Sequence, residues 1–291
     1  MIGHQKIIKV LEKELVRRNL AQAYLFCGPE SVGKRTVAFW LAGKILGKEK
    51  VEKHSDFIFL QPESQEKNGV VKKGEIKIEE IRELQKKLSF TSLEGKGKVA
   101  VVDDADKMNI PTQNSLLKTL EESNEKTTII LITGNEKKIL PTIISRCRKV
   151  KFGLVGNEGL KKMVPEDRKD KEAIIFWSLG RPGVAQKLIS DEKELLFMRE
   201  SFQEFKDLFS VPAHEKFALA EKSGLNIPAL IKKMDIWSAL LRVSLLGQSA
   251  KIKISPRKSL RLLGEIEKSL EMLKSSNANA KLILENLFLS F

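Results

Sequence analysis

Cysteine, histidine and long apolar runs are scarce in this sequence of 291 residues. The two cysteines, Cys27 and Cys147, lie far apart, and we expect both to be reduced, buried side chains that form no disulfide. The three histidines are equally scattered. His4, His54 and His214 therefore cannot complete a zinc site of the CxxC type with so few cysteines, and no zinc is expected.

Membrane segments are also absent from the sequence pattern. No stretch of about 18 consecutive apolar residues occurs, which argues against a membrane span. The first residues, MIGHQKIIKVLEKELVRR, lack the apolar core of a secretory signal and have the spacing of an amphipathic helix. With 42% hydrophobic and 31% charged residues, the composition is that of a globular protein. We therefore expect a cytoplasmic protein without membrane contact.

Basic residues outnumber acidic ones by 52 to 38, which gives a formal net charge of +14. Clustered Lys and Arg side chains bind phosphate backbones by releasing counterions, so a nucleic-acid partner is one explanation. The lysines are spread along the chain, however, and a solvated basic surface explains them equally well. Charge alone leaves both explanations open.

A glycine-rich loop separates an apolar run at residues 23–27 from a segment with helical spacing at 36–46. Gly28, Gly33 and Lys34 match G-x-x-x-x-G-K, in which backbone N–H groups cradle phosphates and the lysine reaches the outer ones. Arg35 stands where a serine or threonine normally ligates Mg²⁺, and Thr36 follows one residue late. The pattern predicts a loop derived from a nucleotide site; the alternative is a structural turn.

Strands and helices alternate in the first half of the chain. Strands are expected at 56–60, 98–106, 127–135 and 148–152, with helices at 76–88 and 111–122. This order predicts an α/β fold with a parallel sheet covered on both faces. Ligands bind at the carboxyl ends of such strands, where the loop, Asp103 with Asp104, and Thr133 are all expected.

Two aspartates end the strand VAVVDD. Asp103 is expected on the metal side of a nucleotide site. Asp104 stands where a glutamate would position the attacking water, and its side chain is one methylene shorter. The alternative is that both carboxylates cap the helix that begins near Asn109.

Several runs occur in a characteristic order: IGHQKI, QAYLFCGPESVGKRTVA, VAVVDDADKMN, NSLLKTLEES, LPTIISRCRKVKF and NANAKLILENLFL. Together they resemble the delta-prime family of bacterial DNA polymerase III clamp-loader subunits, a branch of the AAA+ proteins. The resemblance implies an AAA+ P-loop domain at 1–152, a small helical lid at 153–200 and an all-α collar domain at 201–291. The sequence supports this outline, since strand patterning stops after Phe152.

The resemblance also implies partners. They are gamma or tau and delta subunits in a pentameric ring and, through the assembly, a sliding clamp and primer–template DNA. Relatives commonly carry a four-cysteine zinc module after the first helix of the domain. Here GKEKVEKHSDF passes directly from helix to strand, so this module is missing.

Three departures from an active loader ATPase concern one site. Arg35 removes the metal-binding hydroxyl, Asp104 replaces a glutamate, and Gly183 stands where motor subunits carry a lid arginine. Arg181 lies nearby but would point elsewhere on a helix. Because phosphoryl transfer depends on positioning and charge stabilisation, we expect ATP or ADP to be bound weakly or structurally, without turnover and without a metal ion.

Within the resemblance, Arg146 of the run SRC is an arginine finger that reaches the ATP of the adjacent subunit. The alternative is a salt bridge within its own domain. These residues predict a non-hydrolysing stator of the DNA-directed DNA polymerase III holoenzyme, without independent enzymatic activity. Two rivals are a gamma/tau-like motor that hydrolyses ATP, with Thr36 as the hydroxyl, and a basic DNA-binding AAA+ module outside replication.

Overall fold

A computed structural model describes the chain except for residues 1–2, 68–69, 96, 123–125, 246–253 and 276–278. Two compact units are present. The first comprises Met1–Lys67, Val71–Lys171 and Gly180–Gln186, and the second consists mainly of Glu172–Leu179 and Lys187–Phe291. Of the helices in the described ranges, none is both long and apolar enough to span a bilayer.

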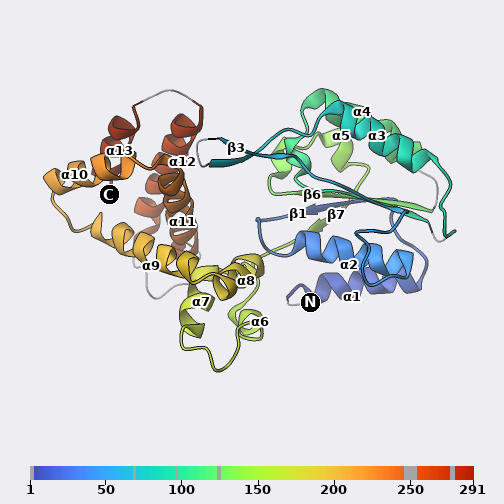
Figure 1. Ribbon diagram of the computed structural model, residues 1–291, viewed down its shortest axis with the longest axis horizontal. Helices are drawn as coiled ribbons and strands as arrows, with labels where there is room; N and C mark the ends of the chain where they lie inside the picture. Colours follow the sequence, from blue (N-terminus) through green and yellow to red (C-terminus); the bar gives the residue numbers. More distant parts are fainter. Residues whose placement is uncertain (1–2, 68–69, 96, 123–125, 246–253, 276–278) are drawn as a thin grey trace. The chain divides into compact units, whose positions relative to one another are not determined.

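The first unit (Figure 1) is built on a parallel sheet of five strands, whose spatial order is β2-β5-β6-β1-β7. The strands are β1 (Ala23–Cys27), β2 (Phe57–Leu60), β5 (Lys98–Val102), β6 (Thr127–Thr133) and β7 (Arg148–Lys151). Every residue of β1, β5 and β6 is buried, which explains why these strands occur as almost continuous apolar runs. The predicted α/β fold is confirmed, and each predicted strand is present, although the strands expected at 98–106 and 127–135 end at Val102 and Thr133.

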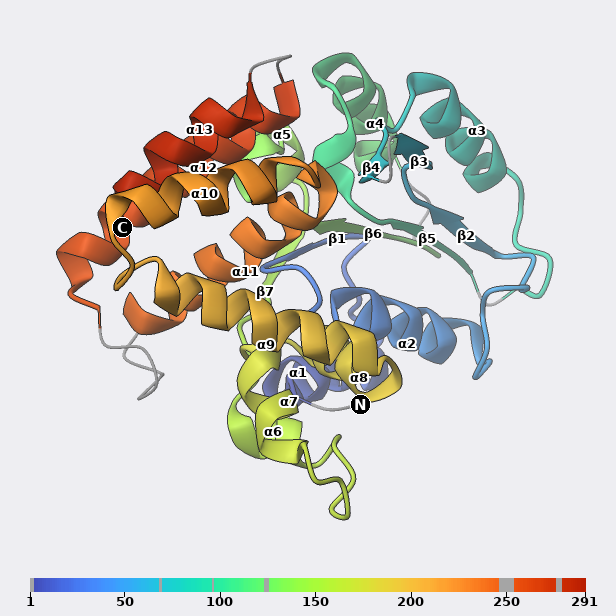
Figure 2. The ribbon, with the colours of Figure 1, turned by 60° about the vertical axis from the view of Figure 1, so that its left-hand side comes forward.

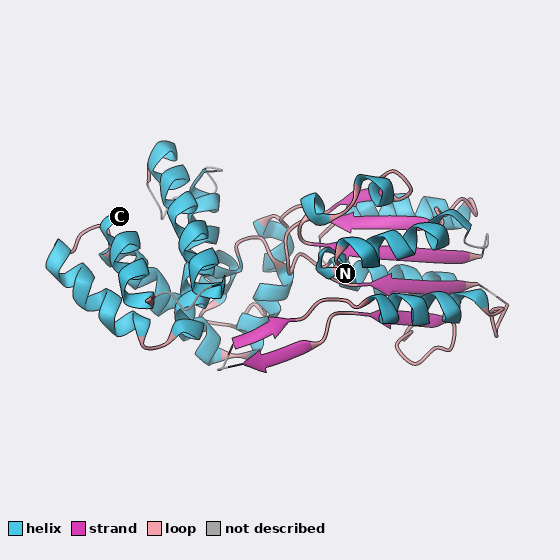
Figure 3. Cartoon of the chain, turned by 90° about the horizontal axis from the view of Figure 1, so that it is seen from above, coloured by secondary structure: helices cyan, strands magenta, loops and turns pink. Residues whose placement is uncertain are grey.

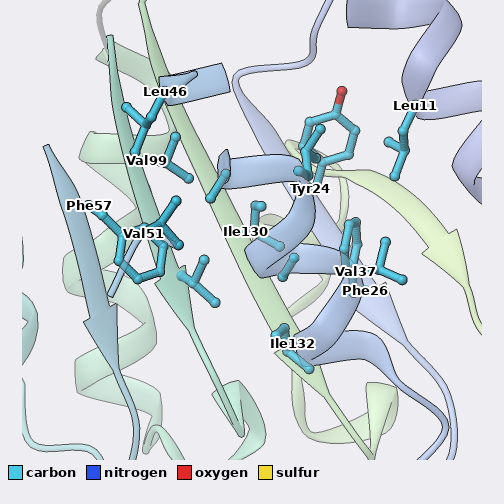
Figure 4. Close-up of a cluster of buried hydrophobic side chains, with 14 of the residues drawn as sticks. Leu11, Tyr24, Phe26, Val37, Leu46, Val51, Phe57, Val99, Ile130 and Ile132 are labelled. Carbon is cyan, nitrogen blue, oxygen red and sulfur yellow. The ribbon is translucent and has the colours of Figure 1, made fainter. Parts of the chain in front are cut away.

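Helices cover both faces of this sheet. On one face, α1 (Gln5–Val16) and α2 (Lys34–Leu46) bury Leu11, Val37 and Leu46 against Tyr24 and Ile130 of the strands (Figure 4). On the other face, an apolar cluster forms beneath α3 (Ile78–Ser89), α4 (Ile110–Glu122) and α5 (Pro141–Ile144). Each buried side chain of this kind contributes about 1.5–3 kcal/mol, so the two layers hold the strand ends in fixed positions.

A two-stranded sheet between β2 and α3 differs from the prediction, which has no strand there. It pairs β3 (Ser64–Lys67) with β4 (Val70–Lys73). Neither strand has the apolar alternation of a half-buried strand, so periodicity gives no signal. The dipeptide Asn68-Gly69 in the sequence between them is a strong hairpin signal, and it would have identified the pair.

Helices make up the second unit from Glu172 onward (Figure 3), and among the described residues no strand follows β7. The change of pattern predicted after Phe152 is therefore confirmed. The helices beyond β7 are α6 (Asn157–Lys161), α7 (Lys171–Ser178), α8 (Pro182–Ser190), α9 (Glu192–Asp207), α10 (Ala213–Gly224), α11 (Ile227–Leu245), α12 (Pro256–Ser275) and α13 (Ala280–Leu289). The run that ends in α13 begins at residues 277–278, which lie outside the described residues.

Aromatic rings form the core of the second unit. Trp237 of α11 is 1% exposed, contacts the rings of Phe205 and Phe288, and donates its indole N–H to the Ser201 carbonyl over 2.8 Å. Helices α10, α12 and α13 lie side by side around α11 (Figure 2). The boundary expected between 200 and 201 falls inside α9, and the division into three domains stays a prediction.

Both cysteines carry free thiols, as predicted. Cys27 is buried in β1, and its S–H donates to the Val150 carbonyl. Cys147 as a whole residue is only partly buried, but burial of its thiol raises the pKa of that group to about 12. Neither thiol has the low pKa of a reactive cysteine.

Candidate functional site

The glycine-rich loop connects β1 to α2 and requires glycine at both glycine positions of its pattern. Gly28 has φ 147°, and a Cβ there would lie 2.2 Å from the Phe152 carbonyl oxygen. Gly33 has φ 102° and is the residue before the first turn of α2. A positive φ at both positions is accessible mainly to glycine, so the loop has the strand-loop-helix context that the sequence predicts.

Lys34 begins α2 and is directed back over the loop. Its Nζ donates to the carbonyl oxygens of Gly28 and Pro29, each over 2.6 Å, and the residue is only 7% exposed. Burial lowers the pKa of the ammonium group, while the nearby carboxylates of Glu30 and Asp103 act in the opposite direction. The two carbonyls occupy two of the three N–H donors of the ammonium group.

Arg35 extends from α2 toward the end of β2. Its guanidinium carbon lies 4.3 Å from the ring centroid of Phe59 and 5.2 Å from that of Phe39. Nη1 donates to Gln61 Oε1 over 3.2 Å and lies 3.9 Å from Asp103 Oδ2. The long cation therefore occupies the space beside the carboxylate that was expected on the metal side.

Asp103 and Asp104 follow β5 directly, at the carboxyl edge of the sheet. The Asp103 carboxylate accepts the Asp104 N–H over 3.0 Å, and Asp104 has φ 50°. The alternative that these aspartates cap α4 is wrong, because Asn109 Oδ1 accepts the Thr112 N–H over 3.0 Å at the start of that helix. Both aspartates line the same cavity as Lys34.

Thr133 at the end of β6 is fully buried and is paired with an acid that sequence reasoning missed. Its hydroxyl donates to Asp106 Oδ1 over 2.7 Å and accepts the Asn135 N–H over 3.0 Å. Asp106 also accepts the Gly134 N–H over 3.1 Å. The signal was present in the run VVDDAD, whose third aspartate stands two residues beyond the pair, but spacing alone does not show which strand it would meet.

A cavity of about 560 Å³ lies over the loop. Its lining includes predicted site residues and others: His4, Glu30, Gly33, Lys34, Arg35, Thr36, Asp103, Asp104, Met163, Gly183 and Gln186. Of the predicted residues, Gly28, Thr133 and Arg146 are not in the lining, although Ile132 and Gly134 on either side of Thr133 are. The edge of the sheet therefore brings the loop residues Lys34, Arg35 and Thr36 together with Asp103 and Asp104, whereas Arg146 lies outside this cavity.

Gly183 packs directly against the loop at the start of α8. Its N–H donates to the Ser31 carbonyl over 2.8 Å, and a Cβ there would lie 3.0 Å from that oxygen. Any larger side chain would have to displace the loop by a few tenths of an ångström. Gly183 thus lines the cavity without supplying a positive charge to it.

Arg146 follows α5 and has an exposed side chain. Its Nε donates to Glu121 Oε1 over 2.7 Å, Nη2 lies 2.5 Å from the same oxygen, and Nη1 donates to the Thr142 carbonyl over 3.0 Å. This is the intradomain salt bridge foreseen as the alternative. The Arg146 side chain is nevertheless 37% exposed, so the arrangement leaves room for a second anion.

The residues around the loop do not fit Mg²⁺. This ion requires oxygen ligands at about 2.0–2.1 Å in near-octahedral geometry, and P-loop enzymes supply a hydroxyl and an acidic strand end. Here position 35 carries a guanidinium 3.9 Å from Asp103, the acid that would hold the ion. Arg35 thus disfavours Mg²⁺ in two ways: it replaces the hydroxyl ligand, and it places a positive charge beside Asp103.

A family model described as DNA polymerase III, delta subunit, matches residues 3–155. DNA polymerase III subunit delta' of Pseudomonas aeruginosa is 31% identical over an alignment of 193 residues, and the match covers 59% of this chain and 57% of the relative. The corresponding protein of Bacillus subtilis is 33% identical over 162 residues, 50% of this chain and 46% of that one. Subunit tau of Bacillus subtilis is 30% identical over 172 residues, 55% of this chain and 30% of the relative.

Solved structures extend the likeness in fold to nearly the whole chain. A gamma subunit-related protein of DNA polymerase III from Thermotoga maritima superposes with a TM-score of 0.53 at 20% identity, covering 96% of this chain and 97% of that one. A mutant of RuvB from Thermotoga maritima superposes with a TM-score of 0.51 at 15% identity, covering 97% of this chain and 88% of that one. These neighbours show an AAA+ fold.

The matched segments span about half the length of the delta' relatives. The family model covers just over half of the 291 residues and includes the loop, both aspartates and Arg146. On this evidence the chain belongs to the delta-prime clamp-loader family of bacterial DNA polymerase III.

Proposed function

We propose that this protein is a non-hydrolysing stator of a clamp loader in DNA replication and that it donates Arg146 to the ATP site of a neighbouring motor subunit. The observation that carries the proposal is the state of its own site. Arg35 lies beside Asp103 and Gly183 packs on the loop, so the metal ligand and the lid cation are both replaced. A site altered in this way retains the fold of an ATPase without its charge stabilisation.

The proposed partners are gamma or tau and delta subunits in a pentameric ring, with a sliding clamp and primer–template DNA reached through the assembly. Relatives named delta' and tau support this assignment. Exposed leucines on the second unit supply apolar surface for helix packing between subunits, among them Leu225, Leu282 and Leu289. A cytoplasmic location follows from the proposed role.

Arg146 is suited to the proposed role by its chemistry. A guanidinium is planar, always charged and able to bond two oxygens of one phosphate through two parallel N–H donors, a fixed geometry that the single nitrogen of a lysine lacks. The side chain is held at the end of α5 by Glu121 and Thr142, so it is ordered before any partner arrives. Ordering in advance lowers the entropic cost of docking on a neighbour's phosphate.

The rival is an active motor subunit of the gamma/tau type. Thr36 lines the cavity, and the tau subunit of Bacillus subtilis is among the relatives, which favours this rival. Steady-state phosphate release by the purified chain separates the two. We expect background release, unchanged in Lys34→Ala. Release that the Lys34→Ala substitution abolishes would establish the motor and overturn the stator.

A further inference from the structure

We propose that the loop cavity binds a nucleoside diphosphate without a divalent cation, because Arg35 provides a fixed positive charge beside Asp103. This inference rests on the proposed function, since it assigns a ligand to the site of a subunit that does not hydrolyse ATP. Whether Arg146 acts on a neighbour is a separate question, because Arg146 does not line this cavity.

The Arg35 side chain is held in place from several sides. The rings of Phe39 and Phe59 lie against the guanidinium at 5.2 and 4.3 Å, and Gln61 accepts a hydrogen bond over 3.2 Å. Cations are attracted to aromatic faces at these distances. The side chain is 51% exposed despite these contacts, and Arg35 lines the cavity next to Lys34 and Thr36. An ordered cation therefore faces the ligand space.

The charges that line the cavity explain why a cation is needed. Glu30, Asp103 and Asp104 present three carboxylates, and Lys34 and Arg35 present two cations. A phosphate brought to such a surface is repelled by the acids unless a positive charge stands between them. Arg35 Nη1 lies 3.9 Å from Asp103 Oδ2, where the guanidinium offsets the negative charge of that carboxylate.

The Arg35 guanidinium also has N–H donors that remain available to a ligand. It carries five N–H donors and keeps its charge at any accessible pH, so the contacts to Gln61 and Asp103 leave further donors for phosphate oxygens. Backbone N–H groups at the start of α2 favour an anion at the same place. Metal-free phosphate binding therefore needs no group beyond those present in the chain.

A diphosphate fits these charges better than a triphosphate. A third phosphoryl group would add negative charge to a cavity whose acids already outnumber its cations, and Gly183 supplies no compensating side chain. Complexation by Mg²⁺ normally offsets the extra charge of a triphosphate. Without the ion, the ligand with the smaller charge is the one that the cavity favours.

The test is equilibrium binding of a fluorescent ADP analogue to the full chain, with Mg²⁺ and with excess EDTA. We expect the wild-type Kd to differ by less than about threefold between the two conditions. Arg35→Gln keeps much of the side-chain length without the charge and is expected to weaken binding in EDTA by at least about tenfold. Arg35→Thr restores a hydroxyl, and this variant is expected to bind the ADP analogue more tightly with Mg²⁺ than with EDTA.

Arg82→Gln is the matched control, since Arg82 is an exposed arginine of α3 outside the cavity lining. Its Kd should equal that of the wild type, and thermal unfolding of each variant checks the fold. The inference is overturned if the wild type binds no ADP, if EDTA weakens its binding about tenfold or more, or if Arg35→Gln binds as the wild type does in EDTA. These results concern the subunit's own loop cavity, which Arg146 does not line, so the proposed arginine finger is tested separately by turnover at the neighbouring site.

Discussion

Glu121 holds the arginine that we propose to act on a neighbour, so its removal is an informative perturbation. Arg146 Nε donates to Glu121 Oε1 over 2.7 Å, and the two side chains are 37% and 48% exposed. In the proposed ring, a phosphate of the neighbour would compete with this carboxylate for the guanidinium. Glu121→Gln keeps the shape of the side chain and removes the competing charge.

The magnitude follows from the exposure of the pair. Ion pairs with this much solvent contact contribute about 0–1 kcal/mol, so releasing Arg146 can raise turnover at the adjoining site by no more than about fivefold. An arginine finger contributes roughly 10³–10⁵ to turnover in related NTPases. The salt bridge is thus too weak to prevent Arg146 from reaching a phosphate.

The assay is DNA- and clamp-stimulated ATP turnover by a reconstituted ring that carries Glu121→Gln. We expect a modest increase, and no further effect of Glu121→Gln when Arg146→Ala is already present. Glu79→Gln on α3 serves as the control for a lost surface carboxylate. A large decrease with Glu121→Gln alone would show that the carboxylate is needed to position Arg146 and would refute the reasoning from competition.

Two predictions concern stability, both measured by urea unfolding. Phe288 is 2% exposed against Trp237, so Phe288→Ala should cost about 3–5 kcal/mol, whereas the exposed neighbour Leu289→Ala should change little; equal costs would contradict the core assignment. Asp56 is buried, which alone would raise its pKa, but hydrogen bonds from Leu93 N, Glu94 N and Ser92 hold its pKa below the ordinary value. The stabilisation is therefore present above about pH 4 and is lost as the pH falls through the lower folded value. Asp56→Asn should lower the free energy of unfolding by about 1–3 kcal/mol at pH 7 and by less in acid. A difference between wild type and variant that stays the same as the pH falls would contradict this.

The sheet and the loop could be predicted because their signals are local. Buried parallel strands must be apolar throughout, so β1, β5 and β6 are visible as runs. Gly28 and Gly33 are required by backbone angles that the pattern itself encodes. Since carboxyl ends of parallel strands share one edge, the predicted positions of Lys34 and Asp103 at one cavity are confirmed.

The side-chain pairings could not be predicted, because they depend on which groups meet across the sheet edge. Arg35 could be identified as a lost metal ligand, but its packing on Phe59 and its approach to Asp103 needed the structure. Asp106 was missed for the same reason, since its partner Thr133 lies 27 positions away in the chain. The fit of Gly183 against Ser31 likewise arises from the docking of α8 on the loop.

The most direct test of the central claim is stimulated ATP turnover by a reconstituted ring in which only this subunit is changed, at Arg146. Arg146→Ala and Arg146→Lys should both assemble normally and both lose turnover at the adjoining motor site, because neither side chain offers the planar pair of N–H donors that a guanidinium presents to phosphate. Arg82→Ala controls for loss of an exposed arginine elsewhere in the same unit. Wild-type turnover in both Arg146 variants would contradict the account and leave Arg146 as the partner of Glu121 alone.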